Sequence, residues 1–163
     1  MKGKEIEELI SKQLLEDYDR LYRVAFSYVH NQEDAMDIVQ ESAYKAIKSS
    51  HKVREASYVS SWIYRIVINT SLDFIKKNKK VVVGVEEYMG KYVDKYTDFD
   101  LENTLNALDE KERTVIVLRF FEDMKLSEIA KITEENINTV KTRLYRALDK
   151  LKVELNESER CAL

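Results

Sequence analysis

The segment 136–152, NINTVKTRLYRALDKLK, combines the spacing of an amphipathic helix with an unusually basic polar side. Its apolar residues recur at intervals of three and four, so that a helix gathers them into a single stripe: Ile137, Val140, Leu144, Leu148 and Leu151. The basic residues all lie outside that stripe: Lys141, Arg143, Arg146, Lys150 and Lys152. Asp149 alone opposes them, although the whole chain has a net charge of −3. A helix of this kind requires a polyanion or an acidic protein as its partner.

A short helical segment and a polar turn precede this basic helix. Residues 126–132, LSEIAKI, have helical spacing, and residues 133–136, TEEN, interrupt it. The inward positions of the short helix are Leu126, Ile129 and Ala130. This order predicts a helix-turn-helix in which Asn136 is the N-cap of the second helix. The turn contains no glycine, so Glu134 or Asn136 is expected to take the backbone conformation that glycine usually supplies.

In a helix-turn-helix, the first turns of the second helix enter the major groove and reach base edges. The residues expected there are Asn138, Thr139, Lys141, Thr142, Tyr145 and Arg146. The plainer alternative is a surface helix whose charges are merely solvated. The short helix and the turn before it favour DNA binding.

Proline is absent from the 163 residues, and glycine occurs only three times. Because helix formers fill the chain, this composition predicts an all-α fold, long enough for one domain or for two small helical domains. Charges run through the first 20 residues, so neither a signal peptide nor a membrane span is expected, and the protein is predicted to be cytoplasmic. The single cysteine, Cys161, excludes an internal disulfide, and we assign it no role.

Three amphipathic helices are predicted in the first half of the chain, over residues 14–29, 33–49 and 60–78. The apolar face of the first comprises Leu14, Tyr18, Leu21, Tyr22, Ala25, Phe26 and Val29. The second directs Ala35, Ile38, Val39, Ser42 and Ala46 inward, and Asp37, Gln40, Glu41, Tyr44 and Lys48 outward. The third directs Ile63, Ile66, Val67, Thr70 and Phe74 inward, and Ser61, Arg65, Asn69 and Lys76 outward. This third helix ends in KKNKK, whose charge alone would hold a phosphate backbone.

Residues 81–99 contain two of the three glycines and lose the helical pattern. They are therefore predicted to link two domains, residues 1–80 and residues 100–163. In the second domain, the D-x-x-E sequence at Asp109 predicts the start of a helix that continues to about Glu122. The inward residues of that helix are expected to be Val115, Leu118 and Phe121.

Four segments, in the right order and spacing, resemble regions two and four of a bacterial extracytoplasmic-function (ECF) sigma factor. They are DAMDIVQESAYKAI (34–47), SSWIYRIVINTSLDFIKK (60–77), VIVLRFFEDMKLSEIA (115–130) and NTVKTRLYRAL (138–148). Within that family the chain is most similar to the V-type sigma factors of Firmicutes. The resemblance implies a two-domain protein, with no enzymatic activity and no cofactor, that binds core RNA polymerase, directs it to promoters and melts the DNA.

The resemblance also implies roles for individual positions. Core polymerase would bind the outward stripe of the second helix, namely Asp37, Gln40, Glu41 and Tyr44. The loop 52–60 and the third helix would bind the minus-10 element and capture a flipped base, through Tyr58, Trp62, Arg65, Asn69, Lys76, Lys77, Lys79 and Lys80. The helix-turn-helix would bind the minus-35 element through Asn138, Thr139, Lys141, Thr142, Arg143, Tyr145 and Arg146. A place in the core is the alternative for Trp62, and Arg119 and Arg143 are expected to serve as phosphate or structural contacts.

Two other classes of protein are alternatives to this resemblance. A one-component helix-turn-helix regulator would need a ligand pocket or a dimerisation helix in residues 1–80, where the sequence has polar stripes and a basic helix end. A metal-dependent enzyme would use His30, Glu33, Asp34, Asp37 and Glu41, but acidic residues are expected in a first helical turn in any case. The resemblance further implies an anti-sigma factor, usually membrane-anchored, and a response to envelope stress such as lysozyme-like wall damage, with no small-molecule substrate.

Overall fold

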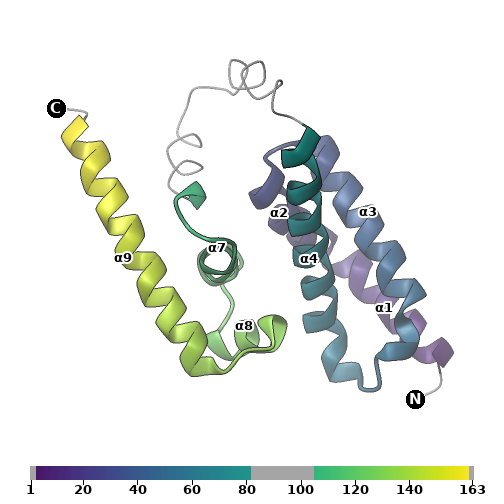
Figure 1. Cartoon of the computed structure of the whole chain (residues 1–163). Helices are drawn as coiled ribbons and strands as arrows, with labels where there is room; N and C mark the ends of the chain where they lie inside the picture. Colours follow the sequence, from purple (N-terminus) through teal and green to yellow (C-terminus); the bar gives the residue numbers. More distant parts are fainter. Residues whose placement is uncertain (1–2, 82–104, 162–163) are drawn as a thin grey trace. The chain divides into compact units, whose positions relative to one another are not determined.

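The computed structural model describes residues 3–81 and 105–161, so the predicted linker 81–99 lies outside the described residues apart from Val81. Every regular element among the described residues is helical, which confirms the all-α prediction (Figure 1). The chain divides into two compact units, the first mainly from Met1–Asn78 and the second mainly from Lys79–Ala130 and Glu135–Leu163. The domain limits 1–80 and 100–163 stay predictions. Within the described ranges, no helix has both the length and the apolar character needed to cross a membrane.

The first unit contains the helices α1 (Gly3–Glu16), α2 (Tyr18–Val29), α3 (Gln32–Lys48) and α4 (Val59–Val81). Two short 3₁₀ turns, Ser50–Lys52 and Ala56–Tyr58, connect α3 to α4. In Figure 1, α2 and α3 lie side by side, and α1 packs against both. The largest fully buried side chains of this unit are Ile10, Leu21, Val24, Ile38, Val59, Ile63 and Val67.

Helix α3 confirms the prediction made from its spacing. All of its predicted inward residues are buried and all of its predicted outward residues are exposed. Asn31 starts the helix, because its side-chain oxygen accepts a hydrogen bond of 3.0 Å from the amide of Asp34. That bond satisfies one of the donors that a first helical turn leaves without an intrahelical partner.

The single helix predicted over 14–29 is wrong. The structure breaks it at Asp17, which lies between α1 and α2 with φ −97° and ψ 8°. Within α2, Val24 is buried, whereas Tyr18 and Phe26 from the predicted apolar face are 40% and 37% exposed. The Asp17 side chain makes no capping hydrogen bond, and its carboxylate accepts from the Gln13 side chain at 2.6 Å. Apolar spacing does not encode the backbone conformation of this one residue.

The second unit contains α7 (Glu110–Ile116), α8 (Leu126–Thr133) and α9 (Ile137–Cys161). A π-helical turn, Val117–Phe121, follows α7 directly. Helix α7 packs on α9, and the fully buried side chains include Val115, Leu118, Ile129 and Val140. The predicted inward positions of Val115 and Leu118 are therefore confirmed.

The π-helical turn corrects the prediction for Phe121, whose side chain is 49% exposed. The amide of Glu122 donates to the carbonyl of Val117, five residues earlier, at 3.1 Å. This wider turn holds one residue more than an α-helical turn, so the residues after it leave the expected face. Phe121 turns outward, and the amide of Met124 closes the end of the segment on the carbonyl of Leu118 at 3.0 Å.

Asp109 begins α7, as its D-x-x-E sequence predicts. Its carboxylate accepts a hydrogen bond of 2.8 Å from the amide of Glu112. Burial raises the pKa of Asp109, but hydrogen bonds from Glu112 and Lys111 and the positive charge of Lys150 outweigh burial and hold the pKa below its ordinary value of 3.8. The ionised carboxylate is thus the form that the folded helix start prefers.

Asp109→Ala should lower the free energy of unfolding of the second unit by ~0.5–2 kcal/mol at neutral pH, the usual cost of losing an N-cap. Because the folded pKa lies below 3.8, the contribution of ionised Asp109 is fully present above that pH and is lost as the pH falls through the folded pKa. Urea unfolding followed by circular dichroism at several pH values would measure both effects. Asp109→Asn is the matched control, since asparagine keeps the cap but cannot ionise. An Asp109→Ala protein as stable as the parent at pH 7 would contradict the expectation.

Candidate DNA and polymerase interfaces

In the turn between α8 and α9, Glu134 takes the backbone conformation that glycine usually supplies. This residue has φ 53°, in the left-handed region, and the amide of Glu135 after it donates to the carbonyl of Ala130 at 3.1 Å. Asn136 then caps α9, because its side-chain oxygen accepts from the amide of Asn138 at 2.8 Å. Both predictions for the turn are confirmed, and together these bonds fix where the second helix starts.

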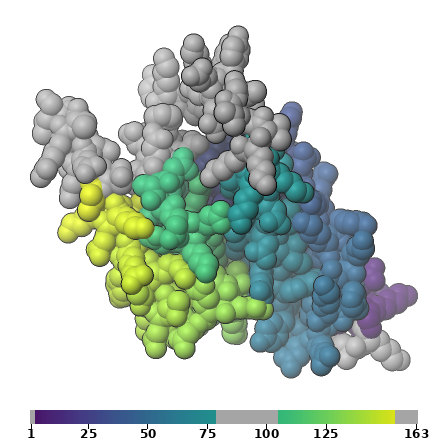
Figure 2. Space-filling model, viewed as in Figure 1, coloured from purple at the N-terminus to yellow at the C-terminus, as the bar shows by residue number. Residues whose placement is uncertain are grey.

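The first turns of α9 present their polar residues to the solvent. The exposed positions are Asn138, Thr139, Lys141, Thr142, Tyr145 and Arg146, which is the set expected to reach base edges. Val140 and Ala147 are fully buried on the opposite side, so the helix cannot rotate without exposing its core face. Ile137 departs from the predicted stripe: it is exposed, because it is the first residue of α9 and precedes the packed part. In Figure 2, the part of α9 drawn in yellow-green to yellow lies at the surface of the second unit.

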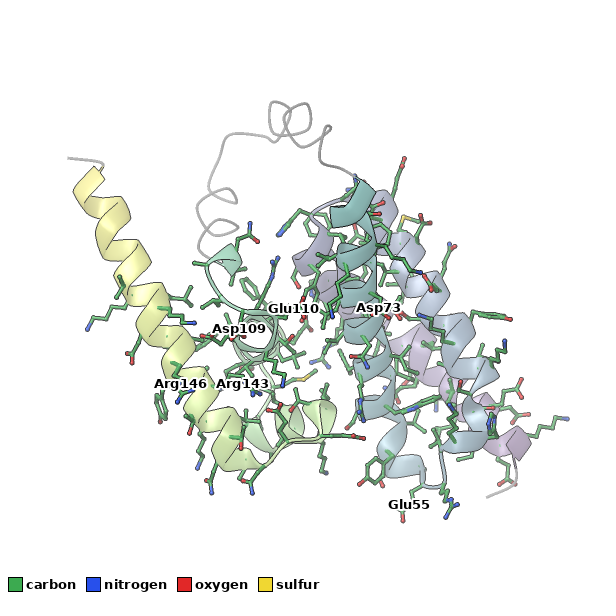
Figure 3. All side chains as sticks on the ribbon, viewed as in Figure 1. Glu55, Asp73, Asp109, Glu110, Arg143 and Arg146 are labelled. Carbon is green, nitrogen blue, oxygen red and sulfur yellow. The ribbon has the colours of Figure 1, made fainter. Side chains whose placement is uncertain are left out.

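A hollow of about 380 Å³ lies between the reading face of α9 and the start of α7. It is lined by Asn138, Thr139, Thr142, Arg143 and Arg146 from α9, and by Asp109, Lys111 and Glu112. Figure 3 labels Arg143 and Arg146 on α9, and Asp109 and Glu110 at the start of α7. The structure therefore places the polar reading residues of α9 next to the charged residues at the start of α7.

Two of the basic residues on α9 are held by carboxylates of the same unit. Arg143 is paired with Glu135, and its side chain is only 19% exposed. Lys150 donates to Glu112 at 2.6 Å, and that carboxylate is 5% exposed. These pairs fasten α9 to the turn before it and to α7. They leave Arg146 and Lys141 as the exposed cations on the reading face.

Arg119 also has structural partners. Its guanidinium donates to the carbonyl of Met124 at 3.2 Å and lies 3.8 Å from the carboxylate of Asp123. Both contacts stay within the segment between α7 and α8. Arg119 and Arg143 therefore make structural contacts, which is one of the two roles expected for them.

The outward stripe of α3 is an exposed, predominantly acidic surface made of Asp37, Gln40, Glu41 and Tyr44. Acidic groups crowd the start of this helix: the pKa of Asp34 is raised, first by burial and then by the charges of Asp37 and Glu33. Further along the helix, Glu41 forms an ion pair of 3.1 Å with Lys45. The ammonium of Lys48 lies 5.6 Å from the ring centre of Tyr44.

A second hollow, of about 280 Å³, lies against one side of α4, which we call the α4 face. Its lining residues are Lys45, Ser49, Lys52, Trp62, Ile66, Asn69, Thr70 and Asp73. The structure thus brings Trp62 and Asn69 together, with Trp62 half-buried and Asn69 exposed. Tyr58 and Arg65 do not line this hollow, although Tyr58 is exposed in the second 3₁₀ turn.

Lys52 belongs to the predicted loop 52–60, but sequence reasoning did not place the other lining residues at this site: Lys45, Ser49, Ile66, Thr70 and Asp73. A signal existed for Asp73, because it follows Trp62, Ile66 and Asn69 at helical spacing on α4. Lys45 comes from α3, and no pattern within one helix could place it there. Lys76 and Lys77 are exposed near the end of α4, while the side chains of Lys79 and Lys80 lie outside the described residues.

These two helical units, one with an exposed acidic stripe and the other with a helix-turn-helix and a basic reading face, have the plan of a two-region sigma factor. Residues 14–81 match the sigma-70 region 2 family, and residues 98–151 match the sigma-70 region 4 family. The chain belongs to the sigma-70 family, in its extracytoplasmic-function group. Sigma factors are transcription initiation factors that bind core RNA polymerase and promoter DNA and are not enzymes in themselves.

The RNA polymerase sigma factor SigV of Bacillus subtilis is 46% identical to this chain over 165 residues, which cover 98% of this chain and 99% of that protein. The ECF sigma factor SigW of the same organism is 30% identical over 158 residues, covering 85% of this chain and 84% of that protein. The similarity to SigV agrees with the V-type resemblance seen in the sequence. The alternative of a one-component regulator is not favoured.

Two solved structures share the fold. The sigma factor RpoE of Bartonella quintana, in complex with the anti-sigma factor NepR, superimposes with a TM-score of 0.66 at 24% identity and covers 90% of this chain and 96% of its own. CnrH, in complex with the cytosolic domain of CnrY, gives a TM-score of 0.67 at 21% identity, covering 93% of this chain and 97% of its own. At these identities the likeness shows the fold alone.

Proposed function

We propose that three surfaces of this sigma factor divide the work of initiation. The α3 stripe binds core polymerase, the α4 face binds the minus-10 element and captures a flipped base, and the first turns of α9 read the minus-35 element. The observation that carries the proposal is the division of α3 and α9 into a buried apolar side and an exposed polar side. The exposed polar residues of the α3 stripe and of the first turns of α9 fill neither core, so they are available to partners.

The α3 surface suits a basic partner. Asp37 and Glu41 supply negative charge, and Gln40 and Tyr44 supply a hydrogen-bonding amide and an aromatic ring within the same two turns of helix. Complementary charge guides the approach of a partner and fixes its register. Burial is the first cause of the raised pKa of Asp34, and the charges of Asp37 and Glu33 raise it further, so these two carboxylates add negative potential at the start of α3.

Replacing both Gln40 and Glu41 with alanine should weaken association with core polymerase by about three- to tenfold, as expected for truncating two contact residues on one exposed face. Neither side chain is buried, so the helical content should not change. Competition for core polymerase against a labelled parent protein would measure the loss. Glu8→Ala, which removes an exposed charge from α1, is the control. If the Gln40/Glu41 variant and Glu8→Ala compete equally well for core polymerase, the α3 stripe is only solvated surface.

An anti-sigma factor completes the proposal. The solved relatives RpoE and CnrH are in complex with NepR and with the cytosolic domain of CnrY. We extend that kind of partner to this chain and place its action in the cytoplasm. A membrane-anchored anti-sigma factor would connect promoter selection to the cell envelope. The resemblance to V-type sigma factors implies envelope stress, including lysozyme-like wall damage, as the stimulus.

A further inference from the structure

Lys45 lies between two of the proposed surfaces. Its ammonium is 3.1 Å from the carboxylate of Glu41, which belongs to the α3 stripe. The same ammonium donates at 3.2 Å to the hydroxyl of Thr70, the residue after Asn69 on α4. Lys45 also lines the 280 Å³ hollow that contains Trp62 and Asn69. The Lys45 side chain thus contacts Glu41 of the α3 stripe, contacts Thr70 of α4, and lines the proposed base site.

The chemistry of the ammonium allows a third contact besides these two. An ammonium has three donors, of which the Glu41 carboxylate and the Thr70 hydroxyl each accept one. Thr70 is buried and fixes the position of the lysine, whereas Glu41 and Lys45 are both about half-exposed, so their pairing is weak enough to exchange. The other charged groups lining the hollow are Lys52 and Asp73, the latter labelled on α4 in Figure 3.

A nucleotide held in this hollow brings a phosphate as well as a base. Trp62 offers a flat wall for the base, and Asn69 an amide for its edge. The phosphate requires a cation, and Lys45 is already positioned at the rim by Thr70. While Glu41 holds it, however, the positive potential of Lys45 is partly cancelled. A partner that engaged the Glu41 carboxylate would restore that potential.

We propose that Lys45 binds a phosphate of the captured single strand, and that Glu41 restrains Lys45 until core polymerase engages Glu41. The proposal rests on the proposed roles of the α3 stripe and of the α4 face. It makes Lys45 a coupling residue, so polymerase binding strengthens single-strand binding. Single-strand binding must strengthen polymerase binding by the same factor, because coupling between two ligands is reciprocal.

Binding of a short, fluorescent single-stranded DNA of randomised sequence to the full chain, followed by anisotropy, tests the proposal. Glu41→Gln should tighten binding about two- to fivefold, the range that a half-exposed ion pair supports. Lys45→Gln should weaken binding and reduce the slope of log K against log salt by ~0.7, the value for one phosphate contact on a single strand. Lys45→Arg should keep that slope, which a purely structural role for the lysine would not predict.

The matched control is Glu33→Gln, which removes the same charge from the exposed side of α3 about two turns from Glu41. The gain from Glu41→Gln should exceed that of the control and should vanish in a Lys45→Gln background. With saturating core polymerase it should also vanish, because Glu41 is then already engaged. Equal effects of Glu41→Gln and Glu33→Gln, or a gain that persists without Lys45, would overturn the coupling.

Asn69→Ala separates failure of this proposal from failure of the base site beneath it. If Asn69→Ala weakens single-strand binding while Glu41→Gln has no effect, the α4 face stands as the single-strand site and only the coupling falls. If neither Asn69→Ala nor Lys45→Gln changes binding, the hollow is not the single-strand site, and both proposals fail together.

Discussion

Replacing Arg146 with alanine should reduce recruitment of the holoenzyme to duplex promoters by about one to two orders of magnitude. Arg146 is exposed one turn beyond Thr142 on the reading face of α9, and it lines the 380 Å³ hollow there. A good bidentate contact to a base edge contributes ~1–3 kcal/mol, and each 1.4 kcal/mol changes affinity about tenfold. Arg143 cannot substitute for it, because Glu135 already holds that guanidinium.

Lys152→Ala is the control for charge alone. Lys152 is an exposed cation on the same helix, about two turns after Arg146, and its loss should cost only a long-range electrostatic effect. Gel-shift titration of holoenzyme on a duplex promoter would compare the two variants at fixed salt. Strengthening the minus-35 element, or tethering the protein to DNA, should restore recruitment of the Arg146 variant. If Arg146→Ala and Lys152→Ala reduced recruitment equally, Arg146 would be a phosphate contact and not a reader of bases.

Periodicity predicted the elements whose two sides differ strongly in polarity. In α3, five apolar or small positions alternate with five polar ones over four turns, so one arrangement satisfies both sets. The turn before α9 was predictable for a different reason. Without glycine, a polar residue of the turn had to take the left-handed conformation, and the candidates named were Glu134 and Asn136.

The remaining errors come from interactions that a local pattern does not encode. The π-helical turn before Glu122 shifts the phase of its helix, so Phe121 leaves the predicted core. The break at Asp17 divides one predicted helix into two, and packing within α2 buries Val24 and leaves Tyr18 and Phe26 exposed. The ion pairs of α9 are equally invisible in sequence. Lys150 and its partner Glu112 are 38 residues apart, and a lysine that pairs with a carboxylate looks the same in sequence as one that meets phosphate.

The lining of the proposed base-capture site could be predicted only in part. The resemblance named Trp62 and Asn69, and the structure brings them to one hollow because both lie on the same side of α4. The resemblance did not name Lys45, which lines the hollow from α3 and donates to the hydroxyl of Thr70. Residues on one helix are related by spacing, but residues on two helices are related only by packing.

Asn69→Ala should reduce transcription about tenfold on both a duplex promoter and a promoter with a pre-opened minus-10 bubble. The amide of Asn69 is exposed beside Trp62, where it can read the edge of an unpaired base, and loss of such a contact costs ~1–3 kcal/mol. Its proposed partner exists only after melting begins. Opening the bubble in advance therefore removes the cost of unstacking but does not replace the missing contact.

Run-off transcription on matched duplex and bubble templates would separate the two sites. The Asn69 defect should persist on the bubble template, whereas a strengthened minus-35 element should rescue Arg146→Ala and leave Asn69→Ala impaired. Asn78→Ala removes an exposed amide from the same helix, more than two turns further on, and serves as the control once circular dichroism has confirmed equal helical content. Full activity of Asn69→Ala on the bubble template would move the base-capture site to the 52–60 loop, where Tyr58 is the exposed aromatic residue.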